Sequence, residues 1–371
     1  MNAVRDQRFM ARAIQLARRG WYTTHPNPRV GCLIVKDDEI IAEGFHRRAG
    51  EPHAERNALA VAGASARGAT AYVTLEPCCH HGRTPPCADA LVEAGLERVV
   101  VAMTDPNPLV AGQGLELLRN AGIAVTEGVM RHQAELLNPG FIKRMTHGLP
   151  YVRCKMAMSL DGRTAMADGE SQWITSPAAR ADVHRLRAQS AAIVTGVGTL
   201  LADDPSLNVR LSSAELELEE GVPVPHPLRV VLDPGLATPK HAKMLGLPGP
   251  TLIVCNDEDP VHGAALEASG AQIIRLPGDR ERLDLHQVMR FLGEQEINDV
   301  LLESGATLAG AMMEQGLVDE LIVYQAPHLM GSDGRGLFLL PGISQMADRI
   351  DLRVTDLRQV GQDIRITARL R

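Results

Sequence analysis

The chain has 371 residues, of which 45% are hydrophobic, 22% are charged and 3% are aromatic, and its net charge is -7. This length predicts two domains, because single hydrophobic cores stop growing at ~250–300 residues. Scarce aromatic residues and the negative charge argue against a general nucleic-acid binder, and no apolar run reaches the ~18–20 residues of a membrane span.

The first part of the chain predicts a mixed order of helices and strands. Residues 1–20 have the spacing of an amphipathic helix and lack the apolar core and cleavage site of a secretion signal. A hairpin follows, with strands at 29–35 and 39–45 and a turn at 36–38. Further helices are expected at 53–63, 87–95 and 114–122, and further strands at 69–76, 98–103 and 123–129. This order favours an α/β fold, an α-β-α sandwich, for the first domain.

A second domain is expected to begin near residues 146–150, which gives domains of residues 1–147 and 148–371. It starts with a strand at 151–159 and a helix at 177–189, with Ser176 as the N-cap and Pro177 in the first turn. Strands are expected at 191–198, 228–233, 251–256, 271–277 and 297–305, a helix at 285–295, and a hairpin at 351–371. The acidic, proline-rich stretch from Ser212 to Pro227 is expected to be a flexible surface insertion.

Histidines, cysteines and a glutamate are concentrated between residues 53 and 87. A catalytic zinc ion has three protein ligands and keeps its fourth position for water. The zinc deaminases combine H-x-E with a later P-C, and their glutamate moves protons without binding the metal. Here His53 and Glu55 match the first half of this signature, and Pro77-Cys78 matches the second.

Spacing alone leaves three candidates for the third ligand, namely Cys79, His81 and Cys87. Cys79 is disfavoured because adjacent residues rarely aim at one point. His81 preserves the two-residue gap of the signature. Cys87 opens a predicted helix, whose N-terminus lowers the pKa of a thiol and favours the thiolate that zinc needs. This argument favours Cys87 over His81 without excluding either.

The position of His53 decides whether Glu55 can act. Residues two apart on a regular helix do not face the same way, so His53 must lie at the helix start. Zinc would then lower the pKa of water towards ~7, and Glu55 would take its proton and pass it to leaving ammonia. A purely structural zinc site closes with four ligands and needs no such carboxylate, which argues against a non-catalytic zinc or nucleotide-sensing protein. Composition also opposes a nucleic-acid-editing deaminase.

Three longer stretches, HPNPRVG, HAERNAL and TLEPCCHHGRTPPCADAL, closely resemble the bifunctional riboflavin-biosynthesis deaminase–reductase family. The resemblance continues through DPNPLVAGQG, SLDGRTAMADGESQWITS, LADDPSLNVR and ESGATLAGAMMEQGLVDELIVYQAP, and it spans nearly the whole chain. It implies that His53, Cys78 and Cys87 are the zinc ligands and that Glu55 is the proton shuttle. The residues that it implies for the pyrimidine pocket are Asn27, His46, Arg83, Asp105 and Asn107.

The second half, taken alone, offers a strand–turn–helix at residues 298–316, and backbone amides at such a helix start can hold a phosphate. Arg187 and Arg210 flank a nearby segment and offer fork geometry for clamping a phosphate. The resemblance implies a dihydrofolate-reductase-like domain that uses NADPH. The implied cofactor contacts are Ala157, Trp173, Thr199, Asp203, Gly305, Ala306, Thr307, Leu308, Ala309, Gly310 and Ala311. The implied substrate contacts are Ser171, Arg187, Leu207, Arg210 and Glu303.

The resemblance also implies two consecutive reactions. The first domain would remove the 2-amino group of 2,5-diamino-6-(5-phosphoribosylamino)pyrimidin-4(3H)-one by hydrolysis, and the second would reduce the ribosyl side chain of the uracil product to ribityl. The implied cofactors are Zn²⁺ and NADPH. The expected partner is a small phosphorylated pyrimidine, with neither nucleic acid nor membrane, and we expect a homo-oligomer. Clustered cysteines are more typical of metal binding or catalysis in a reducing compartment than of a disulfide framework, so we expect a cytoplasmic location.

Overall fold

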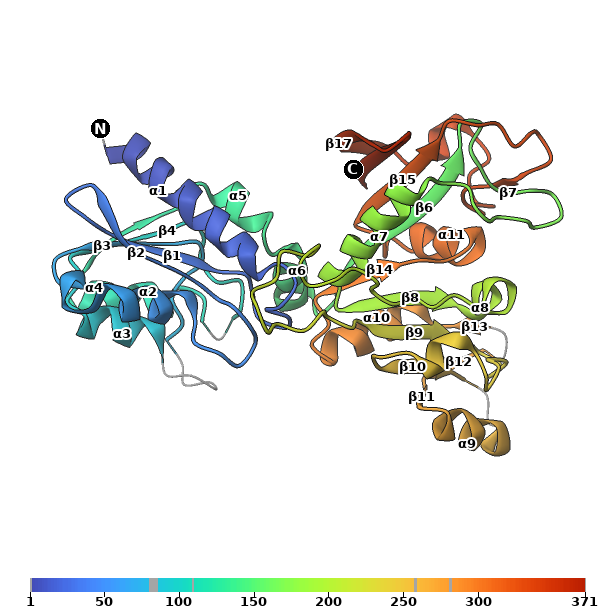
Figure 1. Ribbon diagram of the computed structural model, residues 1–371, viewed down its shortest axis with the longest axis horizontal. Coiled ribbons are helices and arrows are strands. Elements are labelled where there is room, and N and C mark those ends of the chain that lie inside the picture. The colour runs from blue at the N-terminus through green and yellow to red at the C-terminus, as the bar shows by residue number, and fades with distance from the viewer. Residues whose placement is uncertain (1, 80–85, 109, 257–258, 280–281, 371) are drawn as a thin grey trace. The chain divides into compact units, whose positions relative to one another are not determined.

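The computed structural model describes residues 2–79, 86–108, 110–256, 259–279 and 282–370. The chain divides into two compact units, residues 1–149 and 150–371, and each unit has its own sheet and hydrophobic core (Figure 1). The boundary falls between Leu149 and Pro150.

The first unit contains a five-stranded sheet in the order β2-β1-β3-β4-β5. Its strands are β1 (Gly31–Lys36), β2 (Glu39–Phe45), β3 (Thr70–Val73), β4 (Arg98–Val101) and β5 (Ala124–Glu127). Strand β1 pairs antiparallel with β2 and β3, whereas β3, β4 and β5 run parallel. The predicted hairpin is confirmed, and its turn has positive φ angles at Asp37 and Asp38. Strand β3 is shorter than the predicted 69–76 and ends at Val73.

Helices cover both faces of this sheet. They are α1 (Asn2–Ala17), α2 (Ala54–Ala62), α3 (Cys87–Glu93), α4 (Gln113–Asn120), α5 (Arg131–Glu135) and α6 (Pro139–His147). Two glycines let helices approach closely: a Cβ at Gly31 would lie 2.0 Å from a carbonyl oxygen of α1, and one at Gly44 would lie 2.3 Å from a carbonyl oxygen of α2. Figure 1 shows α1 on one side of the sheet and α2, α3 and α4 on the other. The α-β-α sandwich is therefore confirmed, although α5 and α6 were not predicted.

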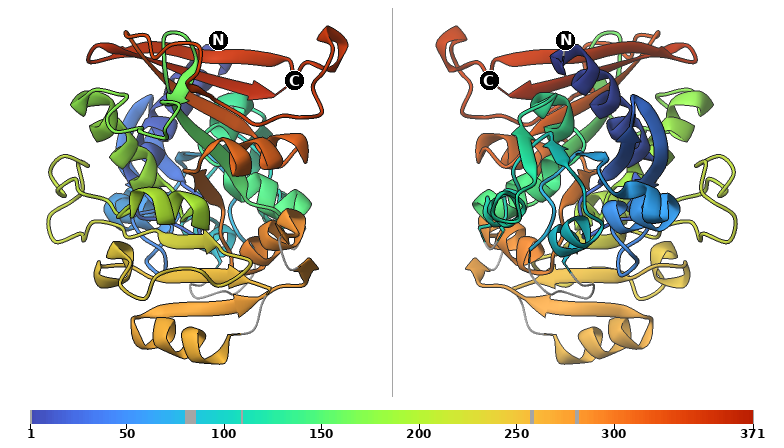
Figure 2. Two further views of the ribbon diagram at one scale, coloured as in Figure 1. Left: turned by 90° about the vertical axis from the view of Figure 1, so that its right-hand side faces the viewer. Right: turned by 90° about the vertical axis from the view of Figure 1, so that its left-hand side faces the viewer.

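The second unit is built on a nine-stranded sheet in the order β11-β10-β9-β8-β14-β6-β15-β18-β17. Its strands are β6 (Tyr151–Ser159), β8 (Ala192–Gly196), β9 (Leu228–Leu232), β10 (Thr251–Cys255), β11 (Ala271–Arg275), β14 (Asp299–Leu302), β15 (Glu320–Ala326), β17 (Leu352–Val360) and β18 (Asp363–Leu370). The strands from β11 to β15 run parallel, and the predicted C-terminal hairpin adds β18 and β17 antiparallel. Figure 2 shows this hairpin at one end of the sheet and β11 at the other.

Five helices accompany this sheet in the described part of the chain: α7 (Pro177–Gln189), α8 (Val197–Asp203), α9 (Pro260–Ala268), α10 (Leu285–Glu294) and α11 (Ala306–Glu314). Two short strand pairs lie outside it, formed by β7 (Arg163–Ala165) with β16 (Arg335–Gly336) and by β12 (Gly278–Asp279) with β13 (Arg282–Leu283). The predicted cap of α7 is present, because the Ser176 side chain accepts a hydrogen bond from the Ala179 amide. The observed ends of α7 match the predicted ends because the sequence marks its start with a capping residue.

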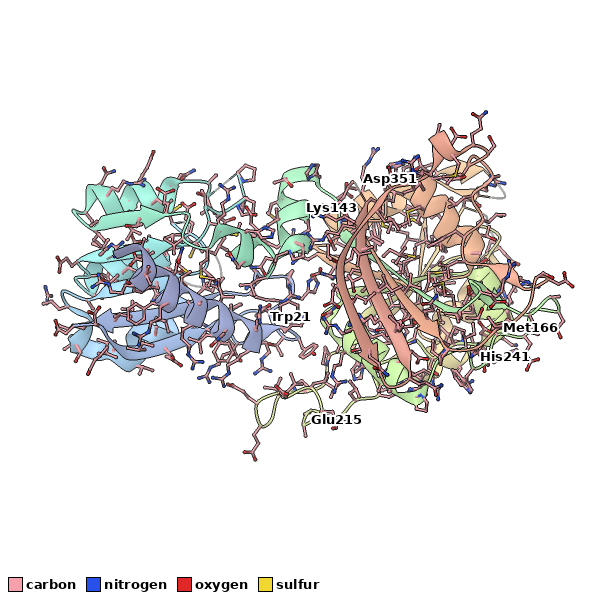
Figure 3. The ribbon with its side chains drawn as sticks, turned by 90° about the horizontal axis from the view of Figure 1, so that it is seen from above. Trp21, Lys143, Met166, Glu215, His241 and Asp351 are labelled. Atoms are coloured by element: carbon pink, nitrogen blue, oxygen red, sulfur yellow. The ribbon has the colours of Figure 1, made fainter. Side chains whose placement is uncertain are left out.

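The stretch from Ser212 to Pro227 forms turns rather than helices or strands. Most of its acidic side chains are exposed, and Figure 3 shows Glu215 pointing outwards from this loop. The prediction of a surface insertion holds for these residues but not for Leu216, which is only 3% exposed. The middle of the stretch therefore carries a buried apolar side chain.

None of the helices in the described ranges is both long and apolar enough to cross a membrane.

Candidate active sites

Three potential metal ligands meet at one end of the first sheet. The ligand atoms of His53, Cys78 and Cys87 all lie within 4.8 Å of one another. The Nδ1 atom of His53 is 3.6 Å from the Sγ atom of Cys78 and 3.4 Å from that of Cys87. A tetrahedral zinc ion with ordinary bond lengths places a nitrogen and a sulfur ligand about 3.6 Å apart. The donor set and its spacing therefore fit zinc.

Helix starts hold these ligands in place. His53 is the N-cap of α2, so the condition that the sequence set for it is met. Cys87 is the first residue of α3, and its backbone N–H donates to the Cys78 sulfur at 3.4 Å. The Arg56 guanidinium donates to the Pro86 carbonyl at 3.1 Å and so joins the start of α2 to the start of α3. The sequence analysis missed this role of Arg56, because the partner lies 30 residues away.

The first backbone N–H of α3 donates to the sulfur of Cys78, whereas the sequence favoured an effect on Cys87. Hydrogen bonds from the Cys87 thiol, from His53 and from the Cys87 backbone lower the pKa of Cys78 to about 4. The hydrogen bond to Cys78, together with burial, raises the pKa of Cys87 instead. The first amide of α3 therefore stabilises the Cys78 thiolate, and the preference for a Cys87 thiolate in the zinc-bound site stays a prediction. Zinc would take both sulfurs as thiolates.

Glu55 lies in the first turn of α2, beside the metal ligands. Its side chain is only 3% exposed and shares a hydrogen bond with the Cys87 thiol. Burial, assisted by the charge of Cys78, raises the pKa of Glu55 to about 7. A carboxyl group with such a pKa can accept and return a proton near neutral pH, which is the task of a proton shuttle.

The structure brings two of the expected pocket residues next to the metal ligands. The side-chain nitrogen of Asn27 lies 3.0 Å from Nε2 of His46, and the rings of His46 and His53 are 5.3 Å apart. Burial lowers the pKa of His46 to about 4, so this imidazole is neutral at pH 7.

Two further pocket candidates share a loop before α4. The Asp105 carboxylate accepts a hydrogen bond from the Asn107 backbone at 2.8 Å, and burial raises its pKa to about 6. The charge of Cys78 contributes to this rise, so the pKa of Asp105 depends on the charge of a metal-ligand candidate. The thiol of Cys79 is directed to the Gln113 side chain at 3.9 Å rather than to the ligand cluster. Arg83 and His81 lie outside the described residues.

A buried ion pair marks the second candidate site. Arg187 on α7 binds Glu303, at the end of β14, through two hydrogen bonds of 2.6 and 2.9 Å. Burial alone would raise the pKa of Glu303, but the charge and hydrogen bonds of Arg187, together with the charges of Lys155 and His184, outweigh it and lower this pKa. The third nitrogen of Arg187 donates to the Asn208 carbonyl at 3.0 Å. The fork that the sequence assigned to a phosphate therefore faces a carboxylate of the same chain.

Other polar residues complete this cluster, and the sequence analysis missed two of them. His184 accepts a hydrogen bond from Arg210 at 3.1 Å, and burial together with the charges of Arg187 and Arg210 lowers its pKa to about 4. Lys155 on β6 interacts electrostatically with Glu303, and burial lowers its pKa. A lysine on a strand in which most residues are apolar was the available signal for Lys155. Arg210 is exposed and so offers its charge to a ligand.

The remaining residues implied for the cofactor differ in accessibility. Gly305 is the N-cap of α11, and its N–H donates to the Thr199 hydroxyl at 3.1 Å. Ala309 and Gly310 are buried, and a Cβ at Gly310 would lie 2.0 Å from the Leu339 carbonyl oxygen. Only the first part of the predicted run therefore offers its backbone to a ligand.

Residues on other elements vary in the same way. Trp173 is 67% exposed. The guanidinium carbon of Arg180 lies over its indole ring, 4.5 Å from the ring centre. Asp203 is exposed at the end of α8, whereas Leu207 is 3% exposed. Ala157 on β6 and Ser171 are half-buried.

Comparison with known proteins identifies both halves of the chain. Residues 3–103 match the cytidine and deoxycytidylate deaminase zinc-binding region, and residues 150–366 match the RibD C-terminal domain. The chain is 53% identical over 365 residues to the riboflavin biosynthesis protein RibD of Escherichia coli strain K12, which covers 97% of this chain and 98% of that protein.

Solved structures agree over the full length. The fold is similar to that of Acinetobacter baumannii RibD, with a TM-score of 0.90, 46% identity and full coverage of both chains. It is also similar to a diaminohydroxyphosphoribosylaminopyrimidine deaminase/5-amino-6-(5-phosphoribosylamino)uracil reductase from Thermotoga maritima, with a TM-score of 0.85, 34% identity and full coverage of both chains.

Proposed function

Because the chain belongs to the RibD family of bifunctional riboflavin-biosynthesis deaminase–reductases, we propose how its residues divide the two reactions. Residues 1–147 deaminate 2,5-diamino-6-(5-phosphoribosylamino)pyrimidin-4(3H)-one to 5-amino-6-(5-phosphoribosylamino)uracil. Residues 148–371 reduce the ribosyl side chain of this product to ribityl. The ligand cluster of His53, Cys78 and Cys87 beside the buried Glu55 is the observation that carries the first assignment.

In the deaminase site, His53, Cys78 and Cys87 hold zinc, which supplies Lewis-acid activation of a water molecule when bound. Glu55 accepts the proton of that water and donates it to the departing amino group. His46 is neutral at pH 7 and bonds Asn27 through Nε2 and the Pro52 carbonyl through Nδ1, so it orients Asn27 towards the pyrimidine without adding charge. The other residues of this pocket are Asn27, Arg83, Asp105 and Asn107.

In the reductase site, a nicotinamide cofactor, which we propose to be NADPH, supplies the hydride when bound. The accessible start of α11 supports a phosphate contact through the backbone N–H groups of Ala306 to Leu308, beside the Gly305 N–H that donates to Thr199, since N–H groups at a helix start favour anions. Ala157, Trp173, Thr199 and Asp203 complete the cofactor site. Ser171, Arg187, Leu207, Arg210 and Glu303 form the substrate site, in which the exposed Arg210 meets the substrate phosphate.

One product assay tests both assignments. The full chain is incubated with the diaminopyrimidine phosphate, and the products are identified by mass spectrometry. Without NADPH we expect ammonia and the uracil derivative, and with NADPH we expect the ribityl compound. A chelator that removes zinc should stop the first step and leave reduction of supplied uracil derivative intact. Ammonia release from metal-free protein would contradict the deaminase assignment, and faster reduction with NADH would contradict NADPH.

We also propose that the chain forms a homo-oligomer through β17. This strand is the edge of the nine-stranded sheet, and it exposes Val354 and Leu357 at 57% and 65%. A long edge strand with exposed apolar side chains favours pairing with another chain. Sedimentation velocity should give a mass above the 40.0 kDa of one chain, and Leu357→Glu should lower it. A monomer at micromolar concentration would contradict this proposal.

A further inference from the structure

Glu76 lies two residues before the zinc-ligand candidate Cys78, and it has no role in the reactions described above. Its side chain is only 3% exposed. In the part of the chain that the structure describes, no lysine or arginine forms an ion pair with it. Burying a carboxylate costs free energy unless hydrogen bonds replace its hydration. The groups that donate these hydrogen bonds therefore show which segment the carboxylate fixes in place.

The partners of Glu76 are backbone N–H groups of one segment. Oε2 accepts hydrogen bonds from Asp105 at 3.0 Å and from Gly112 at 2.9 Å. Oε1 accepts from Gly114 at 2.9 Å and from Leu115 at 3.3 Å. One side chain therefore fixes both ends of the loop between β4 and α4.

The same carboxylate caps helix α4 from a distance. The N-cap of α4 is Gly112, which has no side chain that could accept hydrogen bonds from the free N–H groups of the first turn. Gly114 and Leu115 are in this first turn, and Glu76 supplies their acceptor. A negative charge at a helix N-terminus is also stabilised by the helix dipole. This explains how Glu76 stays buried without a cation.

Close packing makes the arrangement stiff. A Cβ at Gly114 would lie 2.1 Å from the Pro77 carbonyl oxygen, so the start of α4 touches the turn that carries Cys78. The backbone N–H of Glu76 donates to the Met103 carbonyl at 3.0 Å, which ties the same turn to the end of β4. The loop between these anchors carries Asp105 and Asn107.

We infer that Glu76 is a positioning residue of the deaminase site, which holds the loop of Asp105 and Asn107 at a fixed place relative to the zinc ligands. This inference rests on the proposed deaminase function. Glu76 would not touch the substrate, and it acts through the loop. Its loss should therefore weaken pyrimidine binding more than it alters the zinc site.

The test is Glu76→Gln in the full chain. The substitution keeps the shape of the side chain but turns one oxygen into an NH₂ group, which would face two N–H donors. We expect zinc content equal to that of the unaltered chain, unchanged reduction of supplied uracil derivative, and a deaminase KM raised at least about tenfold, because small misplacements of recognition groups have large effects. The deaminase kcat should change less.

Asp6→Asn is the matched control. Asp6 is also 3% exposed in the first unit, and it accepts hydrogen bonds from Tyr72 and Arg98. This variant should lower the thermal stability of the unit and leave the deaminase KM unchanged. Equal kinetics for Glu76→Gln and Asp6→Asn would overturn the inference. Loss of zinc or of the fold in Glu76→Gln alone would also overturn it, because Glu76 would then build the ligand turn rather than position the loop.

Gly114→Ala tests the inference without changing any charge. Its Cβ should push the start of α4 away from Pro77 and produce the same rise in KM with zinc retained. A rise in Gly114→Ala without one in Glu76→Gln would assign the positioning to packing and overturn the role of Glu76. Failure of the unaltered chain to release ammonia would count against the proposed deaminase function and not against this inference.

Discussion

Replacing Glu55 by alanine is expected to abolish ammonia release, lowering the deaminase kcat by at least about 10²–10⁴-fold, the usual contribution of a positioned acid–base group. Zinc should remain bound, because its three ligand candidates are other residues. NADPH oxidation on supplied uracil derivative should also persist, because Glu55 belongs to the first compact unit. Zinc analysis, an ammonia assay and a reductase assay on the same preparation measure the three quantities.

Glu55→Gln separates proton transfer from packing in this experiment. Glutamine fills the same buried space, but it cannot accept a proton, so the loss of kcat should be as large as for alanine. Loss of zinc from either variant would show that Glu55 supports the ligands. Retention of kcat in Glu55→Gln would contradict a proton shuttle at this position.

Replacing Arg187 by alanine is expected to destabilise the second unit by about 3–5 kcal/mol and to raise the reductase KM. The side chains of Arg187 and Glu303 are only 12% and 11% exposed, so the substitution leaves a buried carboxylate without its main partner. The pKa of Glu303, which Arg187 now lowers, should rise. Chemical unfolding and reductase kinetics on the supplied uracil derivative measure the two effects.

A double variant distinguishes the structural part of this effect from binding. Arg187→Met with Glu303→Leu removes both charges, so stability should recover while the reductase stays impaired. Arg349→Ala is a suitable control, because Arg349 and Asp351 form an ion pair with both side chains at least half exposed. Such a pair contributes about 0–1 kcal/mol. An unchanged KM in Arg187→Ala would remove this residue from the substrate site.

Much of the fold could be predicted because its signals are local. The hairpin turn at Lys36 to Asp38, the cap of α7 at Ser176 and the alternating strands of the C-terminal hairpin each depend on residues close together in the chain. Helices α5, α6, α8 and α9 were missed, since none is longer than nine residues and short helices depend on packing for their stability. The early end of β3 at Val73 was also missed.

The sequence by itself determined the chemical types in the two sites: a histidine, two thiols and a carboxylate in the first unit, and a strand–turn–helix with nearby arginines in the second. Only the tertiary structure decided how these groups are paired. It directed the Cys87 amide to the Cys78 sulfur, joined Arg187 to Glu303 and gave α4 a cap from Glu76. Covalent neighbours fix which groups are present, but a hydrogen bond between distant segments forms only once folding has brought its donor and acceptor together, and burial then makes it costly to leave either without a partner.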